Sequence, residues 1–344
     1  MEKRYLLVLG ILLAGLIAVC LIAIMVGPIF IHPLMIIKIW LSKVLGGLIQ
    51  QSWSNIQETI VVDIRTPRVI LSGLVGMGLA IAGAAMQGLF RNPMAEPYVL
   101  GMSSGAACGA ALAIVLGIGK LWGGFSISAL SFIGATTSIF LVYNLAKTDG
   151  RLPTETLLLA GIAVGFFLQA VVSFLKILAS SEALRDVVLW LMGSFSLATW
   201  DDIRLVILPI FAGIGVIYFL SRELNTLQFG EETALHLGIE VEWVKRILLI
   251  ASALVTAVAV SVSGIIGFVG LIIPHVARLM IGPGHHILLP ASALGGGIFL
   301  VFCDTLARTV VQPQEMPIGI ITAAIGAPYF IYLLRRRKKA ISWW

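Results

Sequence analysis

The side chains that could carry chemistry are few and scattered along an apolar chain. Asp304 and Arg308 are four residues apart, so both lie on one face of a helix and can pair. The other acidic groups near apolar segments are Glu182, Asp186, Asp201 and Asp202. Ionisable groups are costly in an apolar environment, so each one is a candidate for function. No carboxylate falls clearly at the centre of an apolar segment.

Nucleophilic or metal chemistry is not indicated. His275 is better interpreted as a packing or capping residue than as a ligand, and His285-His286 would need further ligands to bind zinc. The serines of 103–104 and 261–263 have no His or acid neighbour in sequence, so close packing of small residues explains them better. The three cysteines form no CxxC pair and suggest neither a disulfide framework nor a metal site: Cys20, Cys108 and Cys303.

The chain has no phosphate-binding loop. Gly117-Ile118-Gly119-Lys120 is followed by Leu121 and does not match GxxxxGK[ST]. If the protein's activity is driven by ATP, another subunit must bind and hydrolyse the ATP.

The elements that hold these residues follow from composition. Hydrophobic residues make up 59% of 344 and charged residues 12%, against about 25% charged in a soluble domain. Lipid must therefore solvate most of the surface. The net charge of +6 fits basic loops on the cytoplasmic side of a membrane better than nucleic-acid binding. In a membrane protein, the lack of a central carboxylate argues against a carrier driven by protons or sodium.

Apolar stretches of about 20 residues predict an all-α polytopic membrane protein with about ten spans. They lie at roughly 5–28, 68–90, 98–117, 125–146, 155–178, 202–220, 246–265, 267–282, 287–309 and 317–334. The first is too long for a signal-peptide core of about 7–15 residues. If the seventh and eighth merged, nine spans would put one basic chain end outside. Ten spans place both termini inside, with 14 Lys and Arg inside against 9 outside, as the positive-inside rule favours.

Three stretches do not span. Residues 182–199 predict a helix at the outer surface, and 32–64, with Trp40, Trp53 and Lys43, suit a segment lying along the interface. Residues 222–245 form the longest polar stretch inside. Within it 231–237 has helical character and Gly238 is a helix stop, so it is either a short helix that meets a partner or an ordinary solvated loop.

Glycine spacing predicts close helix packing. Gly101, Gly105 and Gly109 lie at i, i+4 and i+8, on one stripe of a helix. Such a stripe lets a neighbouring helix approach closely, which suits a transporter better than a static anchor.

Several blocks resemble the FecCD-type permeases, the membrane subunits of type II ABC importers for metal chelates. The blocks are GAAMQGLFRNPMAEPYVLG at 83–101, GIIGFVGLIIPHVAR at 264–278, DTLAR at 304–308, EMPIGI at 315–320, GAPYF at 326–330 and DIRTPR at 63–68. The motif residues they contain are Gln87, Asn92, Pro93, Pro97, Gly101, Gly267, Pro274, His275, Arg278 and Asp304. The likeness covers nearly all of the chain after about residue 60.

The resemblance implies one transmembrane permease domain over 1–344 with the type II ABC importer fold. It implies a homodimer, two separate ATP-binding cassette subunits and a substrate-binding protein outside. This chain would be a transport subunit and not an enzyme; it would bind no cofactor itself, since ATP and Mg would sit on the partner ATPase. The location implied is the cytoplasmic (inner) membrane, with both termini cytosolic.

The resemblance also assigns residues. Arg65, Arg68 and Arg308 match outward arginines that dock the binding protein through bidentate contacts to its acids. Alternatively, these arginines only anchor helix ends. The stretch 222–245 matches the ATPase coupling loop, through Gly230, Glu231, Glu232, Ala234, Leu237 and Gly238. Positions that could line the pathway are Leu168, Gln169 and Ser173.

The cargo expected from the family is a ferric siderophore or haem, with cobalamin or molybdate and tungstate as alternatives. The sequence does not name the chelate, because specificity resides largely in the binding protein. A secondary carrier is the rival from another class, but the halves show no convincing inverted repeat. A membrane-embedded enzyme would need a cluster of His or acid residues at one depth, and none is evident.

Overall fold

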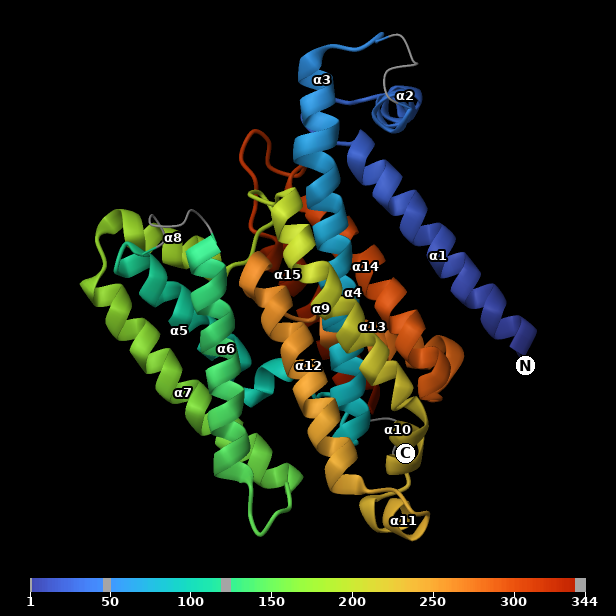
Figure 1. Cartoon of the computed structure of the whole chain (residues 1–344), viewed down its shortest axis with the longest axis vertical. Coiled ribbons are helices and arrows are strands. Elements are labelled where there is room, and N and C mark those ends of the chain that lie inside the picture. The colour runs from blue at the N-terminus through green and yellow to red at the C-terminus, as the bar shows by residue number, and fades with distance from the viewer. Residues whose placement is uncertain (1, 46–50, 119–124, 338–344) are drawn as a thin grey trace.

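In the computed structural model, described for residues 2–45, 51–118 and 125–337, the chain is a bundle of helices (Figure 1). Gly119, Lys120 and Leu121 lie outside these ranges. The helices that match the ten expected spans are α1 (Glu2–Met25), α4 (Thr66–Leu89), α5 (Met102–Val115), α6 (Phe125–Ala146), α7 (Thr154–Leu178), α9 (Trp200–Phe219), α12 (Val241–Ser263), α13 (Val269–Ile281), α14 (His285–Ala307) and α15 (Ile318–Arg337). Among the described residues, seven helices are long and apolar enough to cross a membrane, and α5, α13 and α15 are shorter apolar helices.

The remaining helices lie at the two ends of the bundle. At one end are α2 (Pro33–Val44), α3 (Asn55–Thr59) with the π-helical turn η1 (Ile60–Arg65), and α8 (Ser181–Leu191); at the other are α10 (Ser221–Leu227) and α11 (Glu231–His236). We call these the α3 end and the α11 end. A 3₁₀ turn, η2 (Pro97–Leu100), connects α4 to α5.

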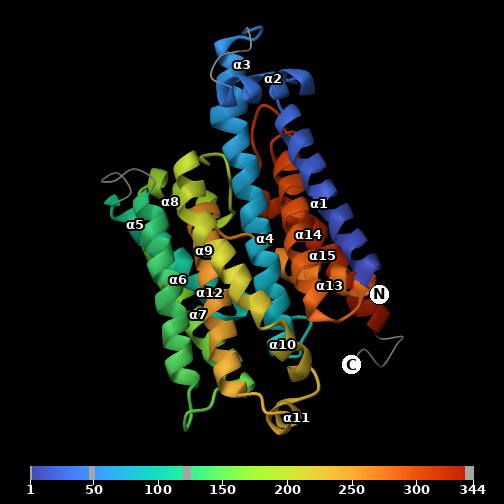
Figure 2. The same cartoon turned by 45° about the vertical axis from the view of Figure 1, so that its right-hand side comes forward.

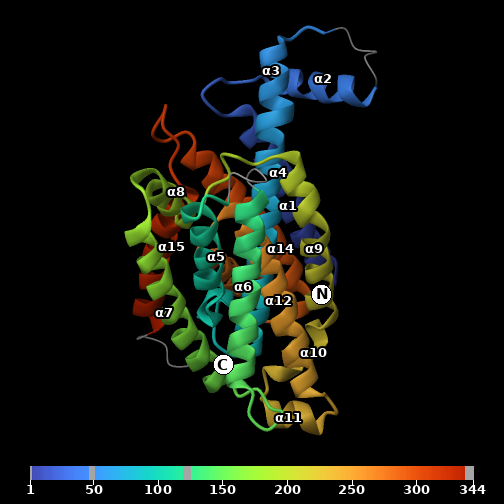
Figure 3. The same cartoon turned by 60° about the vertical axis from the view of Figure 1, so that its left-hand side comes forward.

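Two end segments differ in detail from the sequence prediction. The helix expected over 182–199 stops at Leu191, where Gly193 adopts a left-handed φ of +70°, and the rest is a loop up to the capping box of Thr199 and Asp202. The interface segment of 32–64 is two separate helices, and α2 lies across the end of the bundle (Figure 3).

The seventh and eighth spans are separate helices. The chain leaves α12 at Gly264, with a φ of +69°, and enters α13 through Phe268, a non-glycine residue with a φ of +71°. A left-handed backbone is incompatible with a continuing right-handed helix, so the break is fixed locally. The prediction that these two stretches are separate helices, rather than one merged span, is confirmed.

Helix α4 is the centre of the bundle. It packs against α9, α12, α13 and α14, while α1 runs along the perimeter (Figures 1 and 2). The predicted glycine stripe of α5 faces α6: a methyl group on Gly105 would overlap the carbonyl of Gly134, and one on Gly109 the carbonyl of Leu130. The stripe therefore permits the close α5–α6 approach expected from its spacing.

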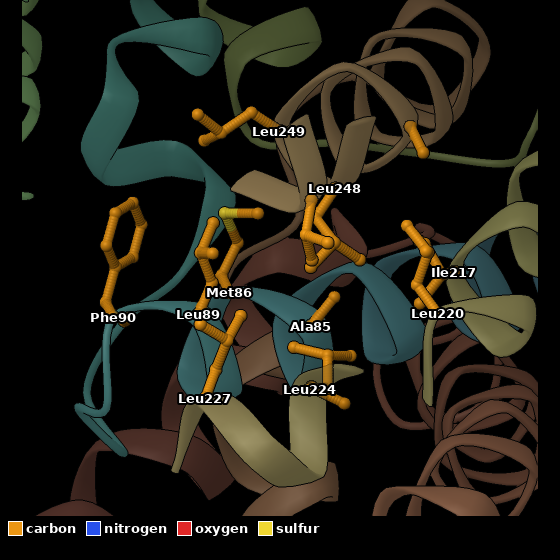
Figure 4. Close-up of a cluster of buried hydrophobic side chains, with 14 of the residues drawn as sticks. Ala85, Met86, Leu89, Phe90, Ile217, Leu220, Leu224, Leu227, Leu248 and Leu249 are labelled. Atoms are coloured by element: carbon orange, nitrogen blue, oxygen red, sulfur yellow. The ribbon is translucent and has the colours of Figure 1, made fainter. Parts of the chain in front are cut away.

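The core at the α11 end joins α4 to the peripheral helices (Figure 4). Met86 and Leu89 of α4 belong to one buried cluster with Leu224 of α10 and Leu248 of α12. This packing fixes α10, and through it α11, against the central helix.

Candidate functional site

A buried ion cluster at the α3 end joins α4 to α14. The Arg68 guanidinium donates from Nε to Asp304 Oδ2 at 3.0 Å and from Nη2 to Oδ1 at 3.0 Å. Its Nη1 reaches the Glu315 carboxylate at 2.9 Å. Arg308, predicted to pair with Asp304 through its i, i+4 spacing, has its Nε 3.6 Å from Asp304 Oδ2. Asp304 therefore neutralises two arginines, and Arg68 has the shorter contacts.

The three arginines assigned to docking are all used inside the chain. Arg65, Arg68 and Arg308 are each buried. Arg65 Nη1 donates to the carbonyls of Ile24 and Met25 at the end of α1, and Arg308 Nη2 donates to the carbonyl of Ala23. These contacts match the alternative, in which the arginines anchor helix ends. Docking of a binding protein on them stays a prediction.

A second polar network holds the break between α12 and α13. Pro274 lacks an N–H, so the carbonyl of Gly270, four residues earlier, has no helical donor. Gln87 of α4 supplies one: its Nε2 lies 3.2 Å from Gly270 O and 3.1 Å from Leu271 O. Arg278 Nη1 donates to Gln87 Oε1 at 3.1 Å. Gln87, Pro274 and Arg278 thus belong to one network, which supplies hydrogen bonds to backbone carbonyls in the first turn of α13.

The loop between α4 and α5 folds back toward this break. Asn92 Oδ1 accepts from the Met94 N–H at 3.0 Å, Pro93 is buried, and Pro97 starts η2. Gly101 turns the chain into α5 with a φ of +76°, and its carbonyl accepts from Ser138 Oγ at 2.8 Å.

Glu96 is an interior carboxylate that sequence reasoning missed. Its carboxylate accepts a hydrogen bond from the backbone of Phe268, and the nearby Tyr98 hydroxyl donates to Ile266 O at 3.0 Å. Glu96 precedes η2 and is not part of a membrane helix, so it does not contradict the expectation that no carboxylate falls clearly at the centre of an apolar segment. In sequence Glu96 sits in a loop, and only the return of that loop between helices places it at the α12–α13 break.

An apolar cavity of about 450 Å³ opens where α8, the α12–α13 break and α15 meet. The residues that line it are uncharged: Leu191, Met192, Ile265, Gly267, Phe268, Gly319, Ile320 and Ala323. Gly267 is the one motif residue in this lining. His275 lies further along α13, with its ring 6.4 Å from that of Tyr329 on α15.

The three candidate lining residues of α7 are not at this cavity. Leu168 packs against buried core residues, while Gln169 and Ser173 are exposed, and Ser173 Oγ donates to Gln169 O. The surface of α7 around them carries large exposed apolar side chains, including Phe166 and Ile177. Their role in a pathway stays a prediction.

The α11 end carries a short helix with an exposed apolar surface. Gly230, with a φ of +110°, precedes α11 and Gly238, with a φ of +83°, follows it. Glu232 is exposed and Leu237 is 66% exposed. Phe229 and Leu235, which were not among the predicted residues, are 75% and 58% exposed. We call Phe229, Leu235 and Leu237 the α11 apolar surface.

Two of the predicted coupling residues point the other way. Ala234 is fully buried against the bundle, and Glu231 forms a 2.6 Å ion pair with the buried Lys245. Both contacts hold α11 against the bundle, although the Glu231 side chain is still 39% exposed. Their role in coupling stays a prediction. No helical spacing in the sequence separates the two sets, because of the three exposed apolar residues only Leu235 lies within α11.

No group of three His, Cys, Asp or Glu residues that could hold a metal ion occurs in the part of the chain that the structure describes.

Comparisons with known proteins agree on one family. The model of the FecCD transport family matches residues 15–336. The cobalamin import system permease protein BtuC of Halobacterium salinarum is 48% identical over 281 residues, which cover 82% of this chain and 74% of that protein. The hemin transport system permease protein HmuU of Yersinia pestis is 42% identical over 285 residues, 81% of this chain and 84% of that protein.

A solved structure agrees with the fold. It is described as an inward-facing conformation of a metal-chelate type ABC transporter. It superimposes with a TM-score of 0.83 at 30% identity, covering 95% of this chain and 98% of that one.

Proposed function

Because the chain belongs to the FecCD transport family, as the permease subunit of an ABC importer for metal chelates, we propose that its cargo is a metal tetrapyrrole, cobalamin or haem. The observation that carries this proposal is that the two relatives just compared are named for cobalamin and for hemin. These names support cobalamin as much as haem, whereas the family resemblance alone led us to expect a ferric siderophore or haem first.

The apolar cavity supports the proposal that the cargo is a macrocycle that binds weakly. Its lining is uncharged, so it offers apolar contact to the ring of a macrocycle and no fixed ion pair to molybdate. A pathway must bind its cargo weakly enough to release it, and apolar contact with a large macrocycle meets that need without a strong site.

We propose that the α11 end faces the cytosol and docks an ATP-binding cassette subunit. The α11 apolar surface offers three large exposed side chains in water, where an apolar patch marks a protein contact. Basic residues at this end, including Arg91, Arg151 and Arg222, support the orientation through the positive-inside rule. ATP and Mg would then be bound by the partner.

We propose that two copies of the chain form the permease. Helix α7 packs mainly against α5, α6 and η2, and large apolar side chains on the rest of its surface are exposed. A second copy that covers α7 would enclose a pathway between the subunits and bring Gln169 and Ser173 to its wall.

Docking of a binding protein would occur at the α3 end. Arg68 can meet an incoming carboxylate only if Glu315, which is 44% exposed, gives way, because Asp304 and Glu315 occupy its guanidinium. Glu315 thus stands where a partner's acid would sit.

The test is reconstitution of the full chain with its ATPase and binding protein in proteoliposomes. Uptake and ATPase stimulation are measured with cobalamin, haem, a ferric siderophore and molybdate. Stimulation by cobalamin or haem alone supports the proposal. Stimulation by a siderophore or molybdate alone refutes the tetrapyrrole cargo, and cargo uptake without any ATPase would favour a secondary carrier.

A further inference from the structure

Lys245 is a buried cation that the functions described so far do not use. It lies in the second turn of α12 and is 3% exposed. An ammonium group removed from water is tolerated only if acceptors surround it. Lys245 Nζ meets three: Glu231 Oε2 at 2.6 Å, the Leu152 carbonyl at 3.3 Å and Glu242 Oε1 at 3.5 Å.

These three acceptors come from three different elements. Glu231 is the first residue of α11, Glu242 belongs to α12, and Leu152 lies in the turn between α6 and α7. An ammonium has three N–H donors, so each can be directed at one element. The Lys245 side chain therefore joins α11, α12 and the α6–α7 turn near the α11 end, and we call this set of contacts the Lys245 junction.

The contact at Leu152 involves both of its backbone groups. Its N–H donates to Glu242 Oε2 at 2.9 Å, while its carbonyl accepts from Lys245. Leu152 itself is buried, and Pro153, the N-cap of α7, follows directly. Two side chains of α12 thus hold the backbone of Leu152, two residues before Thr154, where α7 begins.

The junction provides a side-chain link from α11 to α7. Helix α11 packs on α10 and α12, whereas α7 packs on α5, α6 and η2. A displacement of α11 that keeps the Glu231–Lys245 ion pair must also pull on the Leu152 backbone. Charged hydrogen bonds at a buried site resist such separation more strongly than exposed ones.

We propose that Lys245 is a positioning residue for energy coupling, which ties the ATPase-facing helix α11 to the start of the pathway helix α7. This inference rests on the proposed function, in which α11 contacts an ATPase. It assigns to Lys245 the transmission of movement between two helices that do not pack on each other extensively.

The test compares Lys245→Met with Lys245→Arg in the full chain, assembled with its ATPase and binding protein. The readout is cargo taken up per ATP hydrolysed, together with the amount of ATPase that co-purifies. We expect Lys245→Met to assemble and hydrolyse ATP but to lower the ratio on the order of fivefold. Lys245→Arg keeps a charged donor for both carboxylates and should retain most of the ratio.

Arg151→Met is the matched control. Arg151 is an exposed cation in the same turn, so its loss changes the local charge without opening the junction. It should leave the ratio unchanged. If Lys245→Met does not assemble, Glu242→Gln replaces it, since this variant loses the charge facing Lys245 while its amide oxygen can still accept from Leu152.

The outcomes distinguish a failure of the Lys245 coupling role from a failure of the proposed function. If uptake and ATP hydrolysis fall together, in step with the amount of folded complex, Lys245 is only a structural staple and the inference is overturned. If the wild-type chain binds no ATPase, the proposed function fails before Lys245 is tested. A lower ratio in Lys245→Met, with a normal ratio in Arg151→Met, supports the coupling role.

Discussion

The guanidinium of Arg68 and the carboxylate of Asp304 meet through two parallel hydrogen bonds near 3.0 Å, between α4 and α14. Both side chains are almost fully buried, at 7% and 2% exposure. The pair lies where α1, α4 and α14 converge, because Arg308 on the other side of Asp304 also donates to the end of α1. One carboxylate thus organises the α3 end.

Replacing that carboxylate should destabilise the fold. Asp304→Ala leaves the buried Arg68 and Arg308 without their shared acid, and breaking a buried pair costs about 3–5 kcal/mol. We expect a clearly lower thermal unfolding midpoint of the purified protein in detergent. Arg204→Ala, which removes an exposed ion pair with Asp201, serves as the control and should change the midpoint little. An unchanged midpoint for Asp304→Ala would show that the cluster contributes no net stability.

Freeing Arg68 from Glu315 should tighten binding-protein docking. Glu315→Gln removes the more exposed of the two acids on Arg68 and leaves Asp304 in place. If Arg68 receives an acid from the binding protein, affinity should rise by about fivefold at low salt, and the gain should shrink as salt increases. Glu182→Gln removes an exposed acid at the same end as a control. If the wild type, Glu315→Gln and Glu182→Gln bind the binding protein with equal affinity, Arg68 has a purely structural role.

The Gln87 and Pro274 side chains should be energetically coupled. Gln87→Leu leaves the Gly270 carbonyl without a donor, at a cost of about 1–3 kcal/mol. In Pro274→Ala the new N–H can supply that carbonyl, so Gln87→Leu should cost less in this background. A double-mutant cycle on unfolding midpoints or denaturant curves measures the coupling. Strict additivity of the two changes would contradict this account of the network.

Helix α4 should not tolerate a methyl group where it crosses α13. A Cβ on Gly83 would overlap the backbone of Gly270, which cannot move away as a flexible side chain could. Gly83→Ala should therefore reduce the yield of folded protein and its thermal midpoint. Gly215→Ala in α9 meets nothing within 4 Å and is the matched control. Similar behaviour of the two variants would mean that the helices separate more easily than the packing implies.

The α11 apolar surface should bind the ATPase without contributing to folding. Phe229→Ser with Leu237→Ser should leave the thermal midpoint near that of the wild type, because both side chains are mostly exposed. The same double variant should lose co-purification with the ATPase subunit.

Ala234→Leu is the counterpart on the buried side of α11. Overpacking a filled site costs about 1–3 kcal/mol, so we expect reduced stability. If Ala234→Leu is stable and the double serine variant still binds the ATPase, the assignment of the two faces is wrong.

The sequence by itself determined the order and the approximate positions of the apolar helices. Hydropathy over about 20 residues is a local property, and so are the break after Ser263, the helical stretch 231–237 and the Asp304–Arg308 spacing. Each depends only on residues that are neighbours in the chain.

Only the tertiary structure decided which side of each helix is buried. In a membrane protein, lipid and core are both apolar, so hydropathy predicts both α4 and α1 as membrane helices although the first is buried and the second is exposed to its surroundings. The contacts Arg68–Asp304, Gln87–Gly270 and Lys245–Leu152 join segments 236, 183 and 93 residues apart, and no local pattern could pair them. The fold removes the two groups of each pair from water together. Each group then provides the hydrogen bonds that water would otherwise supply to its partner.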